Sequence, residues 1–338
     1  MEGYNKKVIM SYWTICRMKT TKKIYVKVSI IFLLGGILLF SSCEKEENQK
    51  IEANRKTLFM YLPWSSNLTN YFYNNISDLE KCITKIGLNN EKVIVFISTG
   101  STEAMMFEIV SSHGRCKREI LKKYKSPPFT TIDGITAILN DVKAFAPASV
   151  YTMIIGCHGM GWLPVYEMKV RSAPHMKMHW EYQGVPLTRY FGGLTAEYQT
   201  DIKSLASGIA NAGMKMEYIL FDDCYMSSIE VAYELKDVTK YLIGSTSEMM
   251  AYGMPYAAIG EYLLGNPDYQ SGCEEFYNFY STYEIMPCGT LAVTDCSELE
   301  NMAAIIKSIN SKYSFDKSLR GTIQRLDGYT PVIFYDFA

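Results

Sequence analysis

At 338 residues, the chain is long enough for one large α/β domain or two ordinary ones. Its formal charge of −1 is the sum of a basic leader and an acidic body, because residues 1–42 hold seven basic side chains and one acid, which leaves 34 − 7 = 27 basic and 35 − 1 = 34 acidic side chains. A net acidic body does not suggest nucleic-acid binding, so we expect no nucleic-acid partner.

Residues 18–42 have the layout of a bacterial lipoprotein signal peptide. A basic start precedes the apolar run Val28–Phe40, and small residues stand before Cys43. This pattern predicts that Cys43 is the lipidated first residue of the mature protein, that 43–55 is a charged linker, and that 1–17 come from an upstream start codon. We expect a lipid anchor in a bacterial membrane, at the outer membrane or cell surface. The alternative is an N-terminal membrane-spanning anchor, which so short a run disfavours.

From Lys56 onward, strand and helix patterns alternate, which predicts an α/β domain with a mostly parallel central sheet and helices on both faces. The segment 163–195 lacks periodicity, and loops of that length are usually functional or disordered. The expected strands are 57–62, 92–98, an edge hairpin of 105–110 and 119–124, then 150–157, 218–221, 241–245, 290–294 and 331–338. The expected helices are 67–85, one capped by Thr130 or Thr131 and ending at Phe145, one beginning near Tyr198, then 227–235, helical patterns within 253–284, and 297–312.

The last predicted strand has no closing turn, so we expect the domain 56–338 to lack a C-terminal portion. The nine cysteines include no C-x-x-C pair and no Cys/His grouping with zinc spacing, which predicts no metal site. Without the leader and Cys43, 9 − 2 = 7 cysteines remain, and an odd number leaves at least one thiol free.

Two predicted turns each follow a buried apolar run and carry a side chain that can take part in catalysis. One turn follows the apolar run 150–157 and begins with His158, and the other, 222–226, follows the run 218–221 and carries Cys224. Turns beyond the carboxyl ends of neighbouring parallel strands lie at one edge of the sheet, so we expect His158 and Cys224 to meet. They are 224 − 158 = 66 positions apart, which leaves room for one crossover connection with a helix.

Such a pair supports nucleophilic catalysis, because an imidazole takes the proton of a thiol and the thiolate is the nucleophile. We expect the backbone amides of Gly159 and Cys224 to form the oxyanion hole, since glycine lets the main chain come close. A carboxylate at Asp222, beside the thiolate, favours substrates that bring a cation. Two alternatives stay open: a single cysteine is more often structural, and Asp222 can cap the following helix.

Four motifs occur in order along the chain: Ile-Gly-Cys-His-Gly-Met-Gly-Trp at 155–162, Phe-Asp-Asp-Cys-Tyr-Met at 221–226, Gly-Ser-Thr-Ser-Glu at 244–248 and Gly-Met-Pro-Tyr at 253–256. Their combination resembles the clostripain family of cysteine peptidases, which has a caspase-like sandwich fold, and the resemblance covers 56–338. It implies a cysteine endopeptidase that cuts peptide bonds after Arg or Lys, with His158 as the base or imidazolium partner and Cys224 as the nucleophile.

The resemblance also implies that Asp222 lines S1, the pocket for the side chain before the cut bond, with Ser247 and Glu248 as its neighbours. It implies no organic cofactor, and a calcium requirement stays open because the chain has no D-x-D-x-D-G loop. The family usually has a small residue where this chain has Asp223. A carboxylate beside the thiol raises the pKa of the thiol and so makes it less reactive, unless the carboxylate faces solvent.

Family precursors are often cut between the His and Cys strands, which predicts self-cleavage after Lys169 or Arg171 in the 163–195 linker. We expect a monomer that acts on peptides or proteins. Two rival functions stay open. One is a catalytically inactive caspase-fold surface lipoprotein that acts as a binding protein. The other is a carboxylate hydrolase that uses Asp222 and Asp223, with or without a metal.

Overall fold

The computed structural model describes residues 54–163, 165, 192–285, 287–328 and 332–336. The predicted signal segment 1–42, the lipidation residue Cys43 and the cleavage residues Lys169 and Arg171 lie outside these ranges. Across the residues that are described, every helix is too short or too polar to span a lipid bilayer.

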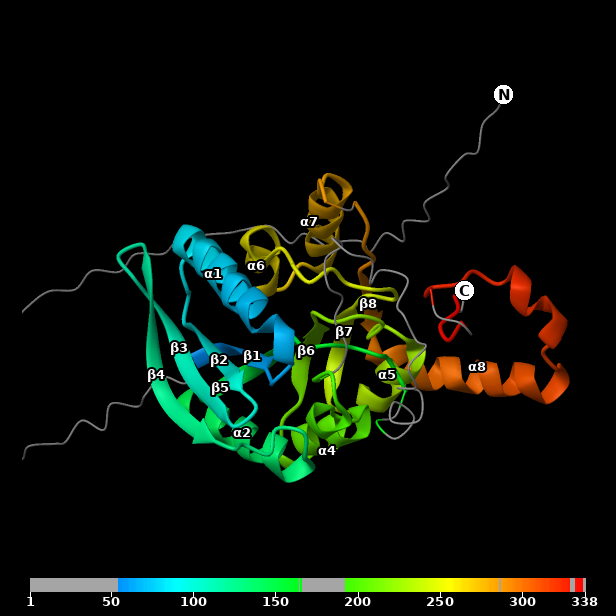
Figure 1. Cartoon of the computed structure of the whole chain (residues 1–338), viewed down its shortest axis with the longest axis horizontal. Helices are drawn as coiled ribbons and strands as arrows, with labels where there is room; N and C mark the ends of the chain where they lie inside the picture. The colour runs from blue at the N-terminus through cyan, green and yellow to red at the C-terminus, as the bar shows by residue number, and fades with distance from the viewer. Residues whose placement is uncertain (1–53, 164, 166–191, 286, 329–331, 337–338) are drawn as a thin grey trace, which may run out of the picture. The chain divides into compact units, whose positions relative to one another are not determined.

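The described chain forms one eight-stranded mixed sheet (Figure 1). Its strands are β1 (Asn54–Leu62), β2 (Glu91–Gly100), β3 (Glu103–Ser112), β4 (Arg115–Lys125), β5 (Ala148–Ile155), β6 (Met216–Phe221), β7 (Thr239–Gly244) and β8 (Ala292–Asp295). They lie in the order β4-β3-β2-β1-β5-β6-β7-β8, and the strands from β2 to β7 in that order are parallel. The β3–β4 hairpin and β8 run antiparallel to their neighbours and form the two edges.

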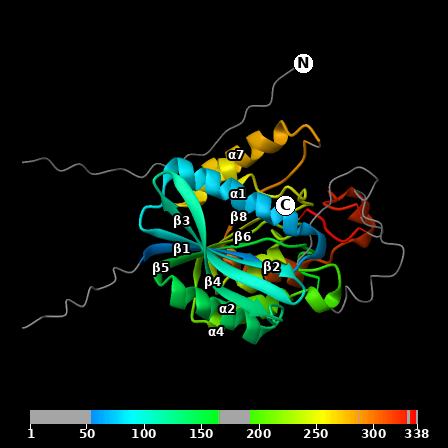
Figure 2. The same ribbon diagram turned by 60° about the vertical axis from the view of Figure 1, so that its left-hand side comes forward.

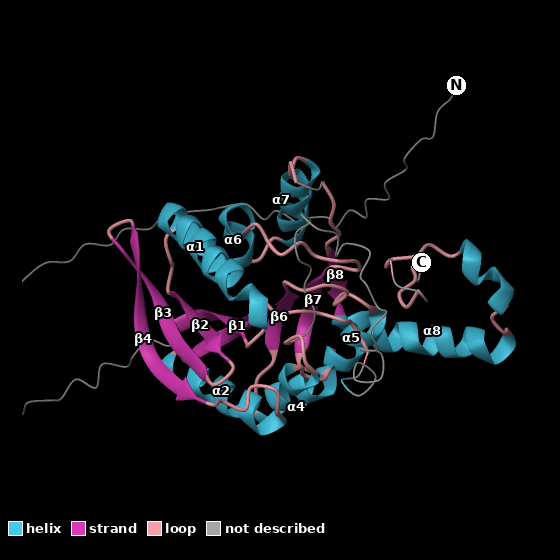
Figure 3. Ribbon diagram, in the orientation of Figure 1, coloured by secondary structure: helices cyan, strands magenta, loops and turns pink. Residues whose placement is uncertain are grey.

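Helices cover both faces of this sheet. They are α1 (Thr69–Ile86), α2 (Ile132–Phe145), α4 (Ile202–Asn211), α5 (Ile229–Leu235), α6 (Tyr256–Leu263) and α7 (Tyr269–Ser281). A further helix, α8 (Leu299–Lys312), follows β8 and buries only Leu299. Helices α1, α6 and α7 lie on one face and α2, α4 and α5 on the other, as the two views of Figures 1 and 2 show and Figure 3 shows by secondary structure. This arrangement confirms the predicted α/β sandwich with a mostly parallel sheet.

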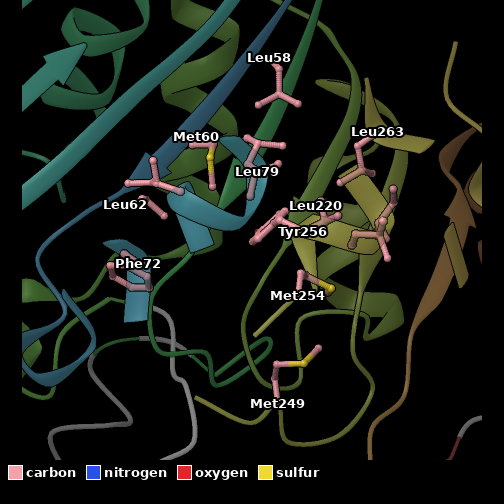
Figure 4. Close-up of a cluster of buried hydrophobic side chains, with 14 of the residues drawn as sticks. Leu58, Met60, Leu62, Phe72, Leu79, Leu220, Met249, Met254, Tyr256 and Leu263 are labelled. Carbon is pink, nitrogen blue, oxygen red and sulfur yellow. The ribbon is translucent and has the colours of Figure 1, made fainter. Parts of the chain in front are cut away.

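The core divides into two clusters because successive residues of a strand face opposite sides of the sheet. In β1, Leu58 and Met60 belong to the cluster under α1 and α6, whereas Phe59 and Tyr61 belong to the cluster under α2 and α4. Figure 4 shows the first cluster, with Leu58 and Met60 from β1 and Tyr256 from α6. A central strand that is buried on both faces needs apolar residues throughout, which explains the continuous apolar runs of the sequence.

Most of the predicted elements are confirmed. The edge hairpin is β3–β4, and Thr131 caps α2, since its Oγ1 accepts a hydrogen bond of 3.1 Å from the backbone N–H of Gly134. The helix expected near Tyr198 is instead a 3₁₀ turn (Ala196–Tyr198), and α4 begins only at Ile202.

The prediction of a strand over 331–338 is wrong for 332–336, the part of this segment that the structure describes. Within 332–336, pairing is limited to one bridge between Arg325 and Tyr335. The carboxylate of Asp327 explains this, because its Oδ2 accepts hydrogen bonds from the backbone N–H groups of Ile333 and Phe334. A backbone N–H that bonds to a side chain is no longer available for a strand ladder.

Candidate active site

The turns that carry His158 and Cys224 begin at the same level of the sheet. Strands β5 and β6 are parallel neighbours, and their ends Ile155 and Phe221 are direct partners. Each candidate residue stands three positions further on, since 158 − 155 = 3 and 224 − 221 = 3. The N–H of Asp222 bonds to the carbonyl of Ile155 at 2.8 Å, which carries the pairing into the turns. The sheet therefore brings together the two turns as the sequence predicts.

The imidazole of His158 lies against a third turn. Its Nε2 is 2.9 Å from Oδ1 of Asn67, and its backbone N–H donates to the carbonyl of Gly192 at 3.1 Å. Asn67 belongs to a 3₁₀ turn (Ser66–Leu68) between β1 and α1, and β1 is the other parallel neighbour of β5. Sequence reasoning missed Asn67. Its only signal is a polar side chain just beyond a strand end.

The thiol of Cys224 lies against the segment that follows β7. Its Sγ accepts a hydrogen bond of 3.1 Å from the backbone N–H of Met249, and the carbonyl oxygen of Met249 is 3.6 Å away. A backbone amide favours the thiolate over the thiol, because a hydrogen bond to an ionised acceptor is the stronger one. Sequence reasoning missed this contact as well, since any residue type can supply a main-chain donor.

Tyr225, the residue after the candidate nucleophile, is held in a strained conformation. Its φ is 59°, which is uncommon for a bulky side chain. Its N–H donates to the carbonyl of Ser247 at 3.0 Å, and its hydroxyl donates to Oε1 of Glu248 at 2.9 Å. Its ring stacks on Phe334 with 4.4 Å between the ring centroids. Such strain persists where the surroundings fix it, and it concentrates at active sites.

Gly159 has no room for a side chain. A Cβ at this position would lie 2.3 Å from the carbonyl oxygen of Cys224 and 3.0 Å from its backbone nitrogen. The main chain of the His158 turn therefore packs directly on the main chain of the Cys224 turn. Only glycine permits an approach this close.

The two aspartates before the cysteine point to different elements. Asp222 is 1% exposed, and its carboxylate accepts hydrogen bonds from the N–H of Met254 at 2.8 Å and from the hydroxyl of Tyr256 at 3.0 Å. Asp223 is 0% exposed, and its Oδ1 accepts a hydrogen bond of 2.6 Å from the N–H of Cys157. Asp223 therefore faces the His158 turn and not solvent. In the part of the chain that the structure describes, no group of three or more His, Cys, Asp or Glu side chains is placed to hold a metal ion.

A cavity of about 340 Å³ borders the segment that holds the thiol. It contains both remaining predicted pocket residues, Ser247 and Glu248, and Glu248 directly precedes Met249. The hydroxyl of Ser247 is 3.0 Å from that of Thr290. The cavity is lined by Ser247, Glu248, Met250, Cys288, Gly289, Arg325, Leu326, Asp327 and Gly328.

Cys82 and Cys296 are two further buried thiols. Burial raises the pKa of Cys82 and of Cys296 to about 11. Both thiols therefore stay protonated at neutral pH, when a thiol is a poor nucleophile.

Comparisons with known proteins agree with this geometry. The model of the clostripain family matches residues 60–330. The X-ray structure of iotapain, a secreted C11 cysteine protease from Bacteroides thetaiotaomicron, is similar with 60% identity and a TM-score of 0.77, over 84% of this chain and 78% of that chain.

Two more distant X-ray structures share the fold. An inactive zymogen C11 protease from Parabacteroides distasonis has 24% identity and a TM-score of 0.68, over 83% of this chain and 75% of that chain. A secreted C11 cysteine protease from Bacteroides thetaiotaomicron in complex with an irreversible peptide inhibitor has 20% identity and a TM-score of 0.65, over 80% and 73%. No curated protein matches the chain. The extent of the family match and the 60% identity to iotapain establish that the chain belongs to the clostripain family of cysteine proteases.

Proposed function

We propose that the chain is an endopeptidase that cuts peptide bonds after Arg or Lys through the thiol of Cys224 and the imidazole of His158. The observation that carries this proposal is the arrangement of the two turns. Both residues stand three positions beyond partnered strand ends, and Gly159 packs on the backbone of Cys224. This arrangement supports a reaction in which a base, a nucleophile and main-chain donors act together at one edge of the sheet.

The proposed reaction begins when His158 takes the proton of the Cys224 Sγ. The thiolate forms a C–S bond to the scissile carbonyl carbon, and the N–H groups of Gly159 and Cys224 donate to the oxyanion. When the C–N bond breaks, His158 returns its proton to the leaving amine and the acyl group stays on sulfur as a thioester. Water, deprotonated by His158, then attacks the thioester, which releases the acid and restores the thiol. The amide of Met249 supports the steps in which sulfur is charged.

The preference for a basic side chain rests on the buried carboxylates around the nucleophile. Asp222 is two residues before Cys224, and Glu248 lines the cavity next to the thiol segment. A guanidinium or ammonium group offsets the cost of keeping a carboxylate away from water. Ser247 completes this proposed S1 pocket, where its hydroxyl oxygen is a neutral acceptor for the N–H groups of the basic side chain.

We also propose that the chain is a precursor that cuts itself after Lys169 or Arg171. The burial of the dyad supports this, because His158 is 1% and Cys224 0% exposed, so a substrate reaches them only after a rearrangement. On this proposal, a Cys224→Ala chain stays intact during storage while the parent chain separates into two pieces. A fully active parent that remains a single chain contradicts self-cleavage.

The lipid anchor at Cys43, its place at the outer membrane or cell surface, and the monomeric state complete the proposal. The support for the anchor is the layout of the leader, with its basic start, apolar run and small residues before a cysteine. Metabolic labelling with a radioactive fatty acid tests the anchor, since the Cys43→Ala chain should take up none. Assays of the parent chain with and without a chelator test whether its activity requires calcium.

Two fluorogenic peptides, one with Arg and one with Leu before the cut bond, test the function itself. The parent should cut the Arg peptide, and Cys224→Ala and His158→Ala should each lower kcat by about 10³-fold or more. The variants Asp222→Asn and Glu248→Gln show which carboxylate binds the basic side chain of the substrate. The variant that lacks this carboxylate should lose its selectivity for the Arg peptide. Full activity in Cys224→Ala would remove the proposed nucleophile.

A further inference from the structure

We propose that Asn67 is the positioning residue of the active site, which fixes the imidazole of His158 in the form protonated at Nε2 and leaves Nδ1 to take the proton of Cys224. This inference rests on the proposed His158–Cys224 dyad and adds a third member to it. Its starting point is the distance of 2.9 Å between Nε2 of His158 and Oδ1 of Asn67.

An amide oxygen can only accept a hydrogen bond, so the ring nitrogen that faces it must donate. In a neutral imidazole one nitrogen carries the proton and the other holds the lone pair. The hydrogen bond made by one nitrogen therefore decides which nitrogen is the base. Because Nε2 of His158 donates to Asn67, the lone pair lies on Nδ1, and the ring can accept a proton there without first changing its tautomer.

The main chain brings the two residues together. Gly156, two positions before His158, donates its N–H to the carbonyl of Tyr61 at 3.1 Å, so β5 stays paired with β1 up to the turn. A Cβ on Gly156 would lie 2.8 Å from Cδ2 of Leu62 and 3.4 Å from Cε1 of Phe72. The absence of a side chain at Gly156 thus permits a close approach to the β1–α1 connection that carries Asn67.

The turn that presents Asn67 is fixed on both sides. Before it, Ser66 adopts a φ of 64°, a left-handed conformation that few residues other than glycine take up. After it, Leu68 is 0% exposed in the core cluster under α1, and α1 begins at Thr69. Asn67 itself is exposed as a residue, so the core does not require its side chain. A polar residue held on a strained turn and pointed at a buried imidazole is a functional arrangement.

The first test observes the imidazole directly and needs no activity. The full-length Cys224→Ala chain, labelled with ¹⁵N-histidine, is studied by NMR at a pH where the ring is neutral, and the His158 signals are identified by their loss in His158→Ala. The expected result is a ring protonated at Nε2. Adding Asn67→Ala should give a mixture of both tautomers, while the matched change Asn70→Ala, at an exposed residue of α1, should leave the spectrum as it was. A ring protonated at Nδ1, or one unaffected by Asn67→Ala, overturns the proposal.

The second test separates positioning from binding and from folding. With the Arg peptide, Asn67→Ala should lower kcat by about 10-fold or more, the effect of losing a hydrogen bond to a charged group, and leave KM within about twofold. Asn67→Asp keeps an acceptor oxygen and should recover most of the lost kcat, while Asn70→Ala should match the parent. If His158→Ala is inactive but Asn67→Ala has an unchanged kcat, the dyad stands and Asn67 has no part in it. If His158→Ala is active, the proposed function itself fails.

Discussion

The carboxylate of Asp223 links the two turns of the active site, because its Oδ1 accepts a hydrogen bond of 2.6 Å from the backbone N–H of Cys157. Its other oxygen lies 3.5 Å from Sγ of Cys157, and both residues are fully buried. A buried carboxylate is costly unless donors satisfy it. Asp223, at a position where the family usually has a small residue, therefore connects the Cys224 turn to the His158 turn through a hydrogen bond.

We predict that Asp223→Ala lowers the free energy of unfolding by about 1–3 kcal/mol, because the N–H of Cys157 is left buried without this acceptor. Asp223→Asn keeps an acceptor oxygen and should cost less. Urea unfolding measures both. Asp237→Ala is the control, since the side chain of Asp237 is 85% exposed and its loss should change stability by about 0.5 kcal/mol or less. Equal effects of Asp223→Ala and Asp237→Ala would contradict a cross-link.

We predict that Gly159→Ala lowers kcat/KM for the Arg peptide by about 10²-fold, the usual result of a shift of about 1 Å at a reacting group. The added Cβ would lie 2.3 Å from the carbonyl of Cys224, so one of the two turns must move. Gly321→Ala is the matched control, because nothing lies within 4 Å of a Cβ there. A Gly159→Ala enzyme as active as Gly321→Ala would mean that the two turns tolerate separation.

The hydroxyl of Tyr225 should matter for selectivity. Tyr225→Phe removes the 2.9 Å hydrogen bond to Glu248 but keeps an aromatic ring to stack on Phe334. We expect a several-fold higher KM for the Arg peptide, because the carboxylate in the proposed S1 pocket loses its orientation, and a smaller change for the Leu peptide. Tyr233→Phe is the control, since the hydroxyl of Tyr233 also bonds to a glutamate, Glu300, at an exposed site. Equal changes in KM for both peptides would exclude a role in selectivity.

Stability at high pH should depend on Tyr218, whose hydroxyl donates to the carbonyl of Leu263 at 3.0 Å. Burial raises the pKa of Tyr218 well above its ordinary value of 10.0. Above about pH 10, the hydroxyl of Tyr218 loses its proton in the unfolded chain but keeps it in the folded chain. The unfolded state therefore binds fewer protons. The free energy of unfolding therefore falls as pH rises, by up to about 1.4 kcal/mol per pH unit for this group.

We predict that Tyr218→Phe lowers the free energy of unfolding by about 1 kcal/mol at neutral pH, because the hydrogen bond is lost. Between about pH 9 and pH 11, the free energy of unfolding should fall less in Tyr218→Phe than in the parent. Urea unfolding across that range measures the slope. Tyr277→Phe is the control, because Tyr277 is 71% exposed and its hydroxyl lacks the burial that acts on Tyr218. A slope unchanged by Tyr218→Phe would show that the phenol is not held protonated by the fold.

The sequence predicted the residues that follow strands but not the contacts that depend on strand order. The proximity of the turns that carry His158 and Cys224 could be predicted because each turn comes directly after a buried apolar run, and the carboxyl ends of parallel strands meet at one edge. Asn67 also follows a strand, yet only the observed pairing of β1 with β5 places it beside His158. The direction of Asp223 was equally hidden, because side-chain alternation stops where the strand ends.

Other features left no trace in residue type. The donor to Cys224 is the backbone of Met249, and a backbone group is the same in every residue except proline. The predicted C-terminal strand was wrong because Asp327, a single carboxylate, takes up the N–H groups that a ladder would use. Apolar patterning records which residues are buried, but it does not record which side chain competes for a backbone donor.

The stack of Phe334 on Tyr225 affects the order in which a working enzyme is assembled during synthesis. The two rings are 334 − 225 = 109 positions apart, so the ribosome adds Phe334 long after the sheet strand that precedes the nucleophile. At about 5–20 residues per second, that interval lasts roughly 5–20 seconds, in which β6 can already pair with β5. The stack of Tyr225 on Phe334 can form only after that interval. We therefore expect a nascent chain to acquire its sheet well before Phe334 packs beside the turn that carries the proposed nucleophile, Cys224.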